Sequence, residues 1–242
     1  MSSISDKITY SQIRIYDLFA NACETGNIQE IKRIYNENPQ IDLTFDNNIV
    51  FVTACANNHL LVAKYLLSID DSQNPIDIAV NNLEPFRSST YFGHYQMTKW
   101  LYDIMIQQFD EPIVHQMIQD KNDEIFRLTC RAGHLYIAQW LLEMIPTINI
   151  STNDNEPFRW ACCNGDLEMV IWLYGLSENI NINMYNDYLF RNICKYGHLN
   201  IIKWLLNLPN VEINISAKSN EAIKNACEQG HIDIVKLLYE EK

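Results

Sequence analysis

The strongest constraint on this chain is a segment of about 33 residues that recurs seven times along the 242-residue sequence. One copy reads "PFRWACCNGDLEMVIWLY" from Pro157 to Tyr174, and related segments start at Leu18, Val50, Pro85, Ile125, Leu189 and Ala222. A glycine or asparagine marks the same place in each copy: Gly26, Asn58, Gly93, Gly133, Gly165, Gly197 and Gly230, at steps of 32, 35, 40, 32, 32 and 33 residues. Such a period predicts a stack of one small unit rather than a globule around a single core.

Each copy is predicted to form two short helices. The first ends at the glycine, which adopts a left-handed conformation without a Cβ penalty, and Asn58 is the next best residue for that place. The second helix has apolar residues at helical spacing, as in Leu199, Ile202 and Leu205. Between units the sequence predicts a polar turn after a short Ile-Asn-Ile strand, at residues 148–150, 180–182 and 213–215.

These features resemble the ankyrin repeat over roughly Asp17 to Tyr239. Pro157 matches the start of the first helix, Phe158 replaces the consensus Leu, and Ala161 and Cys162 match the two Ala before the glycine. The resemblance implies an all-α ankyrin-repeat solenoid. Its units lie near 17–47, 48–81, 82–121, 122–153, 154–185, 186–218 and 219–242, after an N-terminal lead-in or cap at 1–16.

Two departures from the ankyrin consensus recur. The turn glycine becomes a residue that is usually Asn or Asp, types that tolerate positive φ: Asn47, Asn82, Asn122, Asp154, Asn186 and Ser219. The Thr–His pair becomes an acid and a base three residues apart, which predicts ion pairs within one helix: Glu84 with Arg87, Glu124 with Arg127, Glu156 with Arg159, and Glu221 with Lys224. This signature is similar to that of ankyrin-repeat proteins from giant, mimivirus-like DNA viruses of amoebae, which implies a viral protein in the host cytoplasm.

Repeated cysteines and histidines raise the question of chemistry. Six cysteines lie three residues before the glycine position, where a small side chain lets helices approach closely: Cys23, Cys55, Cys130, Cys162, Cys194 and Cys227. Four of them form C-x3-H pairs that could be read as metal ligands, but the glycine between breaks the helix and favours packing and a structural histidine. Cys163 alone lies outside this series and could be a solvent-facing thiol, with no histidine placed to activate it.

The tryptophans divide into two groups. Trp100, Trp140, Trp172 and Trp204 share one repeat position with Tyr65 and Leu237, which favours a core stripe between second helices over partner contact. Trp160 occupies a different position, which elsewhere holds Ser88, Leu128, Asn192 and Asn225. A position this variable has no common packing role, so Trp160 is a candidate for partner contact.

Composition narrows the function classes. The net charge of −12 argues against nucleic acid and anionic membranes as partners. No apolar run reaches the length of a transmembrane helix, and an odd count of seven cysteines without a signal-like N-terminus suggests a reducing, cytoplasmic environment. No phosphate loop or paired catalytic carboxylates appear. We therefore expect no enzyme activity, no cofactor and no metal, and a monomeric chain.

The resemblance implies that the chain binds a partner protein through the concave surface of turns and first helices. The candidate contact residues are Tyr91, Phe92, Arg131, Asn153, Asn155, Trp160, Cys163, Tyr185, Asp187, Lys195 and Tyr196. Two alternatives stay open. One is a substrate or decoy for an ankyrin asparagine hydroxylase, because Leu206 to Asn214 fits the modified pattern, with Asn214 as the modified residue. The other is a structural component of a virion.

The third unit carries an insertion from Asp103 to Asp123, in which Pro112 predicts the start of an extra or lengthened helix. Either the insertion is sequence drift that leaves the stack intact, or it forms a lobe that bends the array or touches a partner. Insertions map to loops on one face of a repeat stack.

Overall fold

The computed structural model describes residues 10–70, 75–176, 180, 182–209 and 211–241. Within this part of the chain the secondary structure is helical, with no strand, which confirms the all-α prediction. The helices are α1 (Tyr10–Glu24), α2 (Ile28–Glu37), α3 (Phe45–Ala56), α4 (Leu60–Ser68), α5 (Val80–Tyr91), α6 (Tyr95–Gln108), α7 (Glu111–Ile118), α8 (Asp120–Arg131), α9 (Leu135–Met144), α10 (Thr152–Asn164), α11 (Leu167–Leu176), α12 (Met184–Tyr196), α13 (Leu199–Leu206), α14 (Ala217–Glu228) and α15 (Ile232–Glu240). None of them is both long and apolar enough to cross a bilayer.

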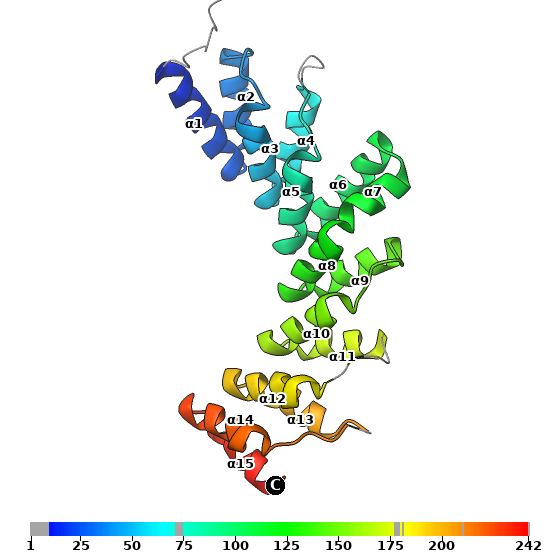
Figure 1. Cartoon of the computed structure of the whole chain (residues 1–242). Coiled ribbons are helices and arrows are strands. Elements are labelled where there is room, and N and C mark those ends of the chain that lie inside the picture. The colour runs from blue at the N-terminus through cyan, green and yellow to red at the C-terminus, as the bar shows by residue number, and fades with distance from the viewer. Residues whose placement is uncertain (1–9, 71–74, 177–179, 181, 210, 242) are drawn as a thin grey trace, which may run out of the picture. The chain divides into compact units, whose positions relative to one another are not determined.

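The chain forms two compact units, residues 1–118 and 119–242. In the first unit the first helices α1, α3 and α5 pack side by side in chain order, and each carries its own second helix, α2, α4 or α6 (Figure 1). In the second unit the same arrangement joins α8, α10, α12 and α14, with α9, α11, α13 and α15 as second helices. Each unit is therefore a row of helical hairpins whose neighbours in sequence are neighbours in space.

Each first helix ends as the glycine position predicts. Gly165 has φ +81° and Asn58 has φ +61°, and the remaining turn glycines share this left-handed conformation: Gly26, Gly93, Gly133, Gly197 and Gly230. The next residue then donates its N–H to a carbonyl five positions earlier, as in His59 to Ala54 at 2.9 Å. This bond satisfies a helix-terminal carbonyl and turns the chain sharply into the second helix.

Five of the first helices also begin with residues in a left-handed backbone conformation. Three successive residues have positive φ at Asp46–Asn48, Asn81–Leu83, Lys121–Asp123, Asn153–Asn155 and Lys218–Asn220. The predicted positive φ is thus confirmed at Asn47, Asn82, Asn122 and Asp154, and Ser219 adopts it as well. Three such residues in a row disfavour most side chains, which explains why Asn and Asp are frequent in these segments.

The predicted Ile-Asn-Ile strands are wrong for the described residues. Ile148 and Ile215 are buried, but the asparagine side chains end the extended stretch at once. Asn149 Oδ1 accepts the N–H of Ser151 at 3.0 Å, and Asn214 Oδ1 accepts that of Ser216 at 3.1 Å. These local turns leave no extended pair of segments for a ladder. Asn181, in the middle copy, lies outside the described residues, as does the lead-in from residue 1 to 9.

A ladder of phenylalanines forms the centre of both units. Phe19, Phe51, Phe86, Phe126, Phe158 and Phe190 occupy one repeat position, seven residues before the glycine position, and are at most 1% exposed. Ile223 holds that position in the last copy. Because each ring lies on a first helix, burial of the ladder holds the first helices together.

The tryptophan stripe is less buried than predicted. Trp140 is 7% exposed, whereas Trp100, Trp172 and Trp204 are only half-buried. Two of these rings contact the phenylalanine ladder of the preceding hairpin, with centroids 6.4 Å apart in both Phe51–Trp100 and Phe126–Trp172. The rings therefore cover the core of the neighbouring hairpin while one edge stays in solvent.

The insertion forms the predicted extra helix. The α7 helix begins at Glu111, one residue before Pro112, and the carbonyl of Asp110 accepts the first N–H groups. Val114 and Ile118 are buried, and α7 packs on α5 and α6. His115 Nε2 on α7 hydrogen-bonds the hydroxyl of Tyr102 on α6 at 2.9 Å. The extra helix α7 is therefore an integral part of the first unit.

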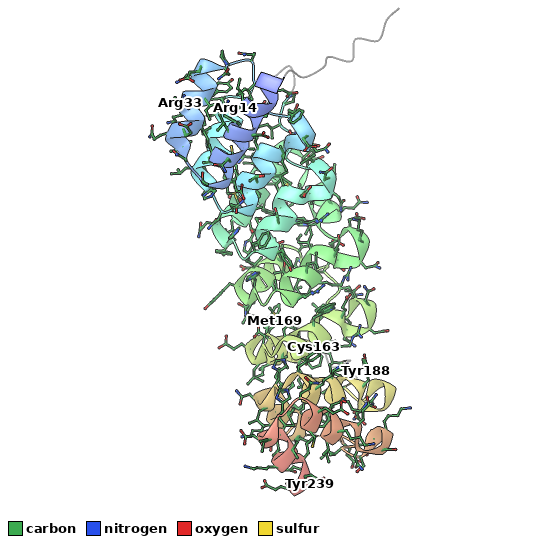
Figure 2. The ribbon with its side chains drawn as sticks, turned by 90° about the vertical axis from the view of Figure 1, so that its left-hand side faces the viewer. Arg14, Arg33, Cys163, Met169, Tyr188 and Tyr239 are labelled. Carbon is green, nitrogen blue, oxygen red and sulfur yellow. The ribbon has the colours of Figure 1, made fainter. Side chains whose placement is uncertain are left out.

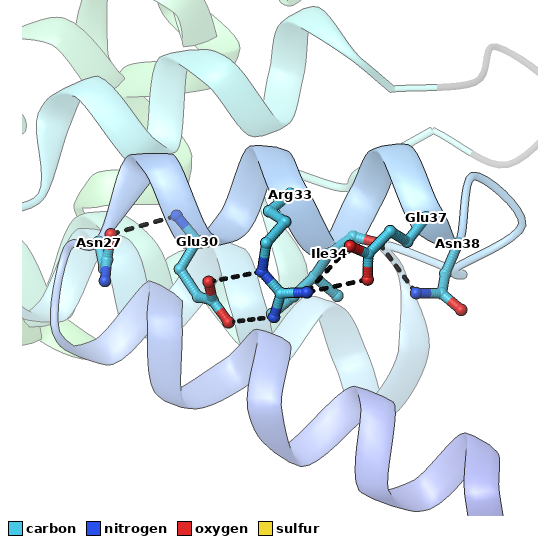
Figure 3. Close-up of polar contacts among 6 residues, drawn as sticks. All are labelled: Asn27, Glu30, Arg33, Ile34, Glu37 and Asn38. Carbon is cyan, nitrogen blue, oxygen red and sulfur yellow. Dashed lines mark hydrogen bonds and ion pairs between the residues drawn. The ribbon is translucent and has the colours of Figure 1, made fainter.

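The outer face of α2 is polar, with Arg33 at the repeat position where four later copies carry tryptophan. The Arg33 guanidinium lies between two carboxylates, with Nη2 2.6 Å from Glu30 Oε1 and Nη1 2.9 Å from Glu37 Oε2 (Figure 3). Asn27 Oδ1 caps the same helix by accepting the N–H of Glu30. All these groups are on the surface, so they favour solubility more than stability.

Candidate protein-binding surface

The repeated thiols serve packing. Five of the six are buried: Cys23, Cys55, Cys130, Cys162 and Cys194. Burial raises the pKa of the Cys23 and Cys194 thiols to about 12, and it raises the pKa of the other three as well. Cys227 departs from the prediction because it is exposed. It lies on α14, after which the described chain contains no further first helix to cover it.

Cys163 is half-buried on α10 and carries no activated thiol. Burial raises the pKa of its thiol, and the nearby Arg159 guanidinium offsets only part of this rise. His198 is adjacent, but its Nε2 hydrogen-bonds the backbone carbonyl of Cys163 at 2.7 Å rather than the sulfur. Nucleophilic chemistry needs a stabilised thiolate, so the surroundings of Cys163 disfavour it.

The histidines bind backward to the preceding hairpin. His59 Nε2 lies 2.8 Å from the carbonyl of Glu24, and three others bind carbonyls at the matching position: His94 with Ala56 at 2.8 Å, His198 with Cys163 at 2.7 Å, and His231 with Lys195 at 3.0 Å. Each of these four rings therefore binds a backbone carbonyl, and in the C-x3-H motifs of His59, His198 and His231 that carbonyl belongs to the preceding hairpin. Among the described residues, no three His, Cys, Asp or Glu side chains gather in a way that could hold a metal ion.

The glycine before the turn makes room for these rings. A Cβ on Gly165 would lie 2.4 Å from His198 Nδ1, and one on Gly26 would lie equally close to His59. Real Cβ atoms do not approach other atoms this closely. Glycine is therefore required twice, for its positive φ and for its missing side chain.

The predicted ion pairs within one helix are wrong. Arg127 pairs with Glu156 of the next hairpin, and Arg191 Nε lies 3.2 Å from Glu221 of the next hairpin. The base also folds back onto its own left-handed turn, as in Arg127 Nε to the carbonyl of Asn122 at 2.9 Å. In this conformation the Arg127 guanidinium extends toward α10, the next first helix. It therefore pairs with Glu156 of α10 rather than with Glu124 of its own helix.

A polar cluster links α8 to α10 around Glu156. Trp160 Nε1 donates to Glu156 Oε1 at 2.8 Å, Asn153 Nδ2 donates to Oε2 at 2.9 Å, and Arg127 pairs with the same carboxylate. Burial alone would raise the pKa of Glu156, but these hydrogen bonds outweigh it and lower the pKa below its ordinary value. The guanidinium of Arg131 stacks on Trp160, with Cζ 3.7 Å from the ring centroid. Trp160 is thus half-buried and held in a fixed orientation.

Five of the predicted contact residues are exposed at the ends of first helices: Tyr91, Phe92, Arg131, Lys195 and Tyr196. We name Tyr91 and Phe92 the first-helix surface of the first unit, and Arg131, Lys195 and Tyr196 the first-helix surface of the second unit. In the first unit Tyr91 and Phe92 are 41% and 54% exposed and meet edge to face, with centroids 5.2 Å apart. In the second unit Tyr196 is 53% exposed and lies against the ring of His198.

The remaining predicted residues take other places. Asp187 is buried and accepts hydrogen bonds from Asn183 Nδ2 at 2.7 Å and from the N–H of Asn214 at 3.4 Å, so it holds the turn. Asn153 is exposed but engaged with Glu156, and Asn155 is half-buried. The side chain of Tyr185 lies outside the described part of the chain. Asn214 is exposed between α13 and α14.

The sequence reasoning missed two residues of the second unit, Arg159 and Tyr188. Arg159 lies on α10 and Tyr188 on α12, two successive first helices that pack together. Figure 2 labels Tyr188 and also Cys163, which lies one helical turn after Arg159 on α10. Tyr188 occupies the repeat position that holds Glu84, Glu124, Glu156 and Glu221 in other copies. The sequence signal that could have identified both residues is the absence of this glutamate from the copy that contains Tyr188.

Comparison with protein families gives a match in the second unit. Residues 191–238, which extend from within α12 to α15, match the family model described as ankyrin repeats (many copies). The comparison with curated proteins gives no match. The family match, together with the rows of helical hairpins, supports an ankyrin-repeat protein.

Proposed function

We propose that this chain is a non-enzymatic scaffold that binds a partner protein through the first-helix surface, the concave face of an ankyrin stack. Ankyrin repeats generally mediate protein–protein interaction. In such repeats the hairpins form a rigid frame, and recognition is left to side chains at the turns and the ends of the first helices. The similarity of the repeat signature to ankyrin proteins of amoebal giant viruses extends the proposal to a host protein as the partner.

The observation that carries this proposal is the exposure of large aromatic and cationic side chains at the two repeat positions directly before the glycine. Tyr91 and Phe92 on α5, and Lys195 and Tyr196 on α12, end in solvent although aromatic rings favour burial. Tyrosine and arginine are among the residues that contribute most to binding energy in protein interfaces. Rigid helix ends also present these side chains with little loss of entropy on binding.

The proposal predicts position-dependent cross-linking to a partner. A photo-reactive phenylalanine analogue in place of Phe92 or Tyr196 should cross-link one protein in an extract of the native or infected cell. The same analogue in place of Tyr136 or Tyr239, exposed residues on second helices, should not. The double change Tyr91→Ala and Phe92→Ala should weaken capture at least about tenfold, equivalent to about 1.4 kcal/mol. Equal capture from second-helix positions would contradict the assigned face.

A second candidate function is modification of Asn214 by an asparagine hydroxylase. The exposed position of this residue between α13 and α14 favours it, because an enzyme could reach the side chain. Its Oδ1 caps the turn at Ser216, so the turn would have to open first. Incubation with an ankyrin hydroxylase and measurement of the intact mass decides this candidate. It predicts a gain of one oxygen atom, which Asn214→Ala abolishes.

A further inference from the structure

A ladder of ion pairs connects the first helices of the second unit, and one step of it is incomplete. Arg127 of α8 pairs with Glu156 of α10, and Arg191 of α12 pairs with Glu221 of α14. At the step between α10 and α12 the base is Arg159, and the position of the acid is taken by Tyr188. At this step the arginine of the ladder is present, as Arg159, but the carboxylate is missing because Tyr188 stands in its place.

Arg159 has no carboxylate within ion-pair distance in the described part of the chain. Its Nη2 donates to the carbonyl of Asn153 at 2.9 Å, while its Nε is buried and has no hydrogen-bond partner among the described residues. The acid nearest in sequence to Tyr188 is Asp187, which is buried and already bonded to Asn183 and Asn214. A half-buried guanidinium without a counter-charge is unfavourable, so a carboxylate brought by a partner would gain a strong contact.

Two further cations flank Arg159 on the same face. Arg131 of α8 and Lys195 of α12 hold the repeat position that Cys163 holds on α10, one helical turn after Arg159. Both are exposed, and neither forms an ion pair with a described residue. On the next first helix, α14, the charge at this repeat position is negative, because Glu228 occupies it. The cationic stretch therefore covers three successive helices, α8, α10 and α12.

Aromatic rings lie between these cations. Trp160 is fixed under Arg131 by stacking and by its hydrogen bond to Glu156, so both groups are preorganised. Tyr188 is 49% exposed and lies 5.6 Å from the Arg191 guanidinium, and Tyr196 follows Lys195 at the helix end. We name Arg131, Arg159, Trp160, Tyr188, Lys195 and Tyr196 together the basic–aromatic strip.

The size of the strip suits an extended peptide. Packed helices lie about 8–10 Å apart, so three adjacent helices span roughly 20 Å. An extended chain covers about 3.3 Å per residue, which corresponds to a segment of about six residues. Alternate side chains of such a segment would face the strip, and carboxylates among them would reach the three cations.

We propose that the basic–aromatic strip binds an acidic, extended segment of the partner protein, with one carboxylate of that segment completing the ladder at Arg159. This inference rests on the proposed function and names the chemistry of the partner. A chain of net charge −12 repels nucleic acid at longer range, whereas a short acidic peptide needs only the local field of the strip.

The test uses the full chain and a fluorescein-labelled peptide of alternating glutamate and leucine, about six residues long. Fluorescence anisotropy should give saturable binding that weakens as salt increases, and the matched lysine–leucine peptide should bind at least about tenfold more weakly. The decisive variant is Tyr188→Glu, because a glutamate on α12 would pair with Arg159 and so compete with the carboxylate of the peptide. It should weaken peptide binding at least about tenfold without lowering the midpoint of thermal unfolding.

Three controls make the outcome specific. Lys203→Gln, which removes an exposed cation from α13, should bind the peptide like the wild type. Tyr188→Gln, which removes the ring without adding a charge, should weaken peptide binding clearly less than Tyr188→Glu. Arg159→Gln should reproduce the loss seen with Tyr188→Glu. Circular dichroism melts show that each variant is folded.

The inference is overturned if no saturable binding occurs, if Tyr188→Glu binds as well as the wild type, or if the lysine peptide or a single-stranded oligonucleotide binds equally well. Cross-linking of a partner at Phe92 or Tyr196, independent of Arg159, would then leave the proposed function intact and remove only the acidic segment. Cross-linking confined to second helices would remove the proposed function itself.

Discussion

Replacing Phe158 with alanine should lower the free energy of unfolding of the second unit by about 3–5 kcal/mol. The ring is 1% exposed on α10, between α8 and α12, so its removal leaves a cavity that rigid first helices cannot close. In a stack stabilised by contacts between neighbours, a defect at an inner hairpin weakens two interfaces at once. Urea unfolding followed by circular dichroism measures the loss, and a shallower transition would show that the flanking hairpins have separated.

Tyr188→Ala is the matched control for Phe158→Ala, because its ring is half in solvent on the adjacent first helix. It should change the free energy of unfolding by about 0.5 kcal/mol or less. Equal losses in the two variants would show that the phenylalanine ladder is not the centre of the fold.

Replacing Gly165 with alanine should cost about 2–3 kcal/mol of unfolding free energy. A left-handed backbone penalises any Cβ by about 1–2 kcal/mol. The new methyl would also displace the ring of His198 and break its hydrogen bond to the carbonyl of Cys163, a loss of about 1 kcal/mol. The same urea titration measures this effect.

Gly230→Ala isolates the backbone part of this cost, because its φ is +76° and a Cβ there would meet no atom within 4 Å. It should lose only about 1 kcal/mol. Adding His198→Ala to Gly165→Ala removes the clash, so the two changes should not be additive. Strict additivity would mean that the ring does not press on the glycine.

Much of the fold follows from the sequence because the repeat itself is a physical constraint. The glycine positions predict the left-handed helix ends, as at Gly165 and Asn58, and Pro112 predicts the extra helix α7. These features depend on the local backbone preferences of one or two residue types. Such preferences act in the same way whatever the neighbouring hairpin contains.

Contacts between hairpins were harder to predict. The acid and base of one copy are three residues apart, so local spacing favoured a pair within the helix, whereas Arg127 binds Glu156, 29 residues later. Which acid an arginine meets depends on the register between neighbouring helices, and a single copy does not contain this information. Arg159 was not recognised for the same reason. Its importance depends on the next copy, where Tyr188 replaces the glutamate that would pair with it.

Position within a row also changes the role of a repeated residue. Cys194 and Cys227 occupy equivalent positions, yet the first is buried under the following hairpin and the second is exposed on α14. The half-buried Trp204 is likewise less buried than the core stripe predicted from its repeat position. A repeat pattern therefore predicts on which face of its helix a residue lies. How deeply the residue is buried depends on the hairpin that packs against that face.

Alkylation of the native chain with iodoacetamide, resolved for each cysteine by mass spectrometry, tests most directly whether the repeated residues serve stacking rather than chemistry. Cys227 should react like a free surface thiol, and Cys163 more slowly. The five buried thiols should react at least about a hundredfold more slowly than Cys227, because they become accessible only when the hairpins open. Rapid labelling of all five in the folded chain, or their protection by stoichiometric Zn²⁺, would contradict a packing role.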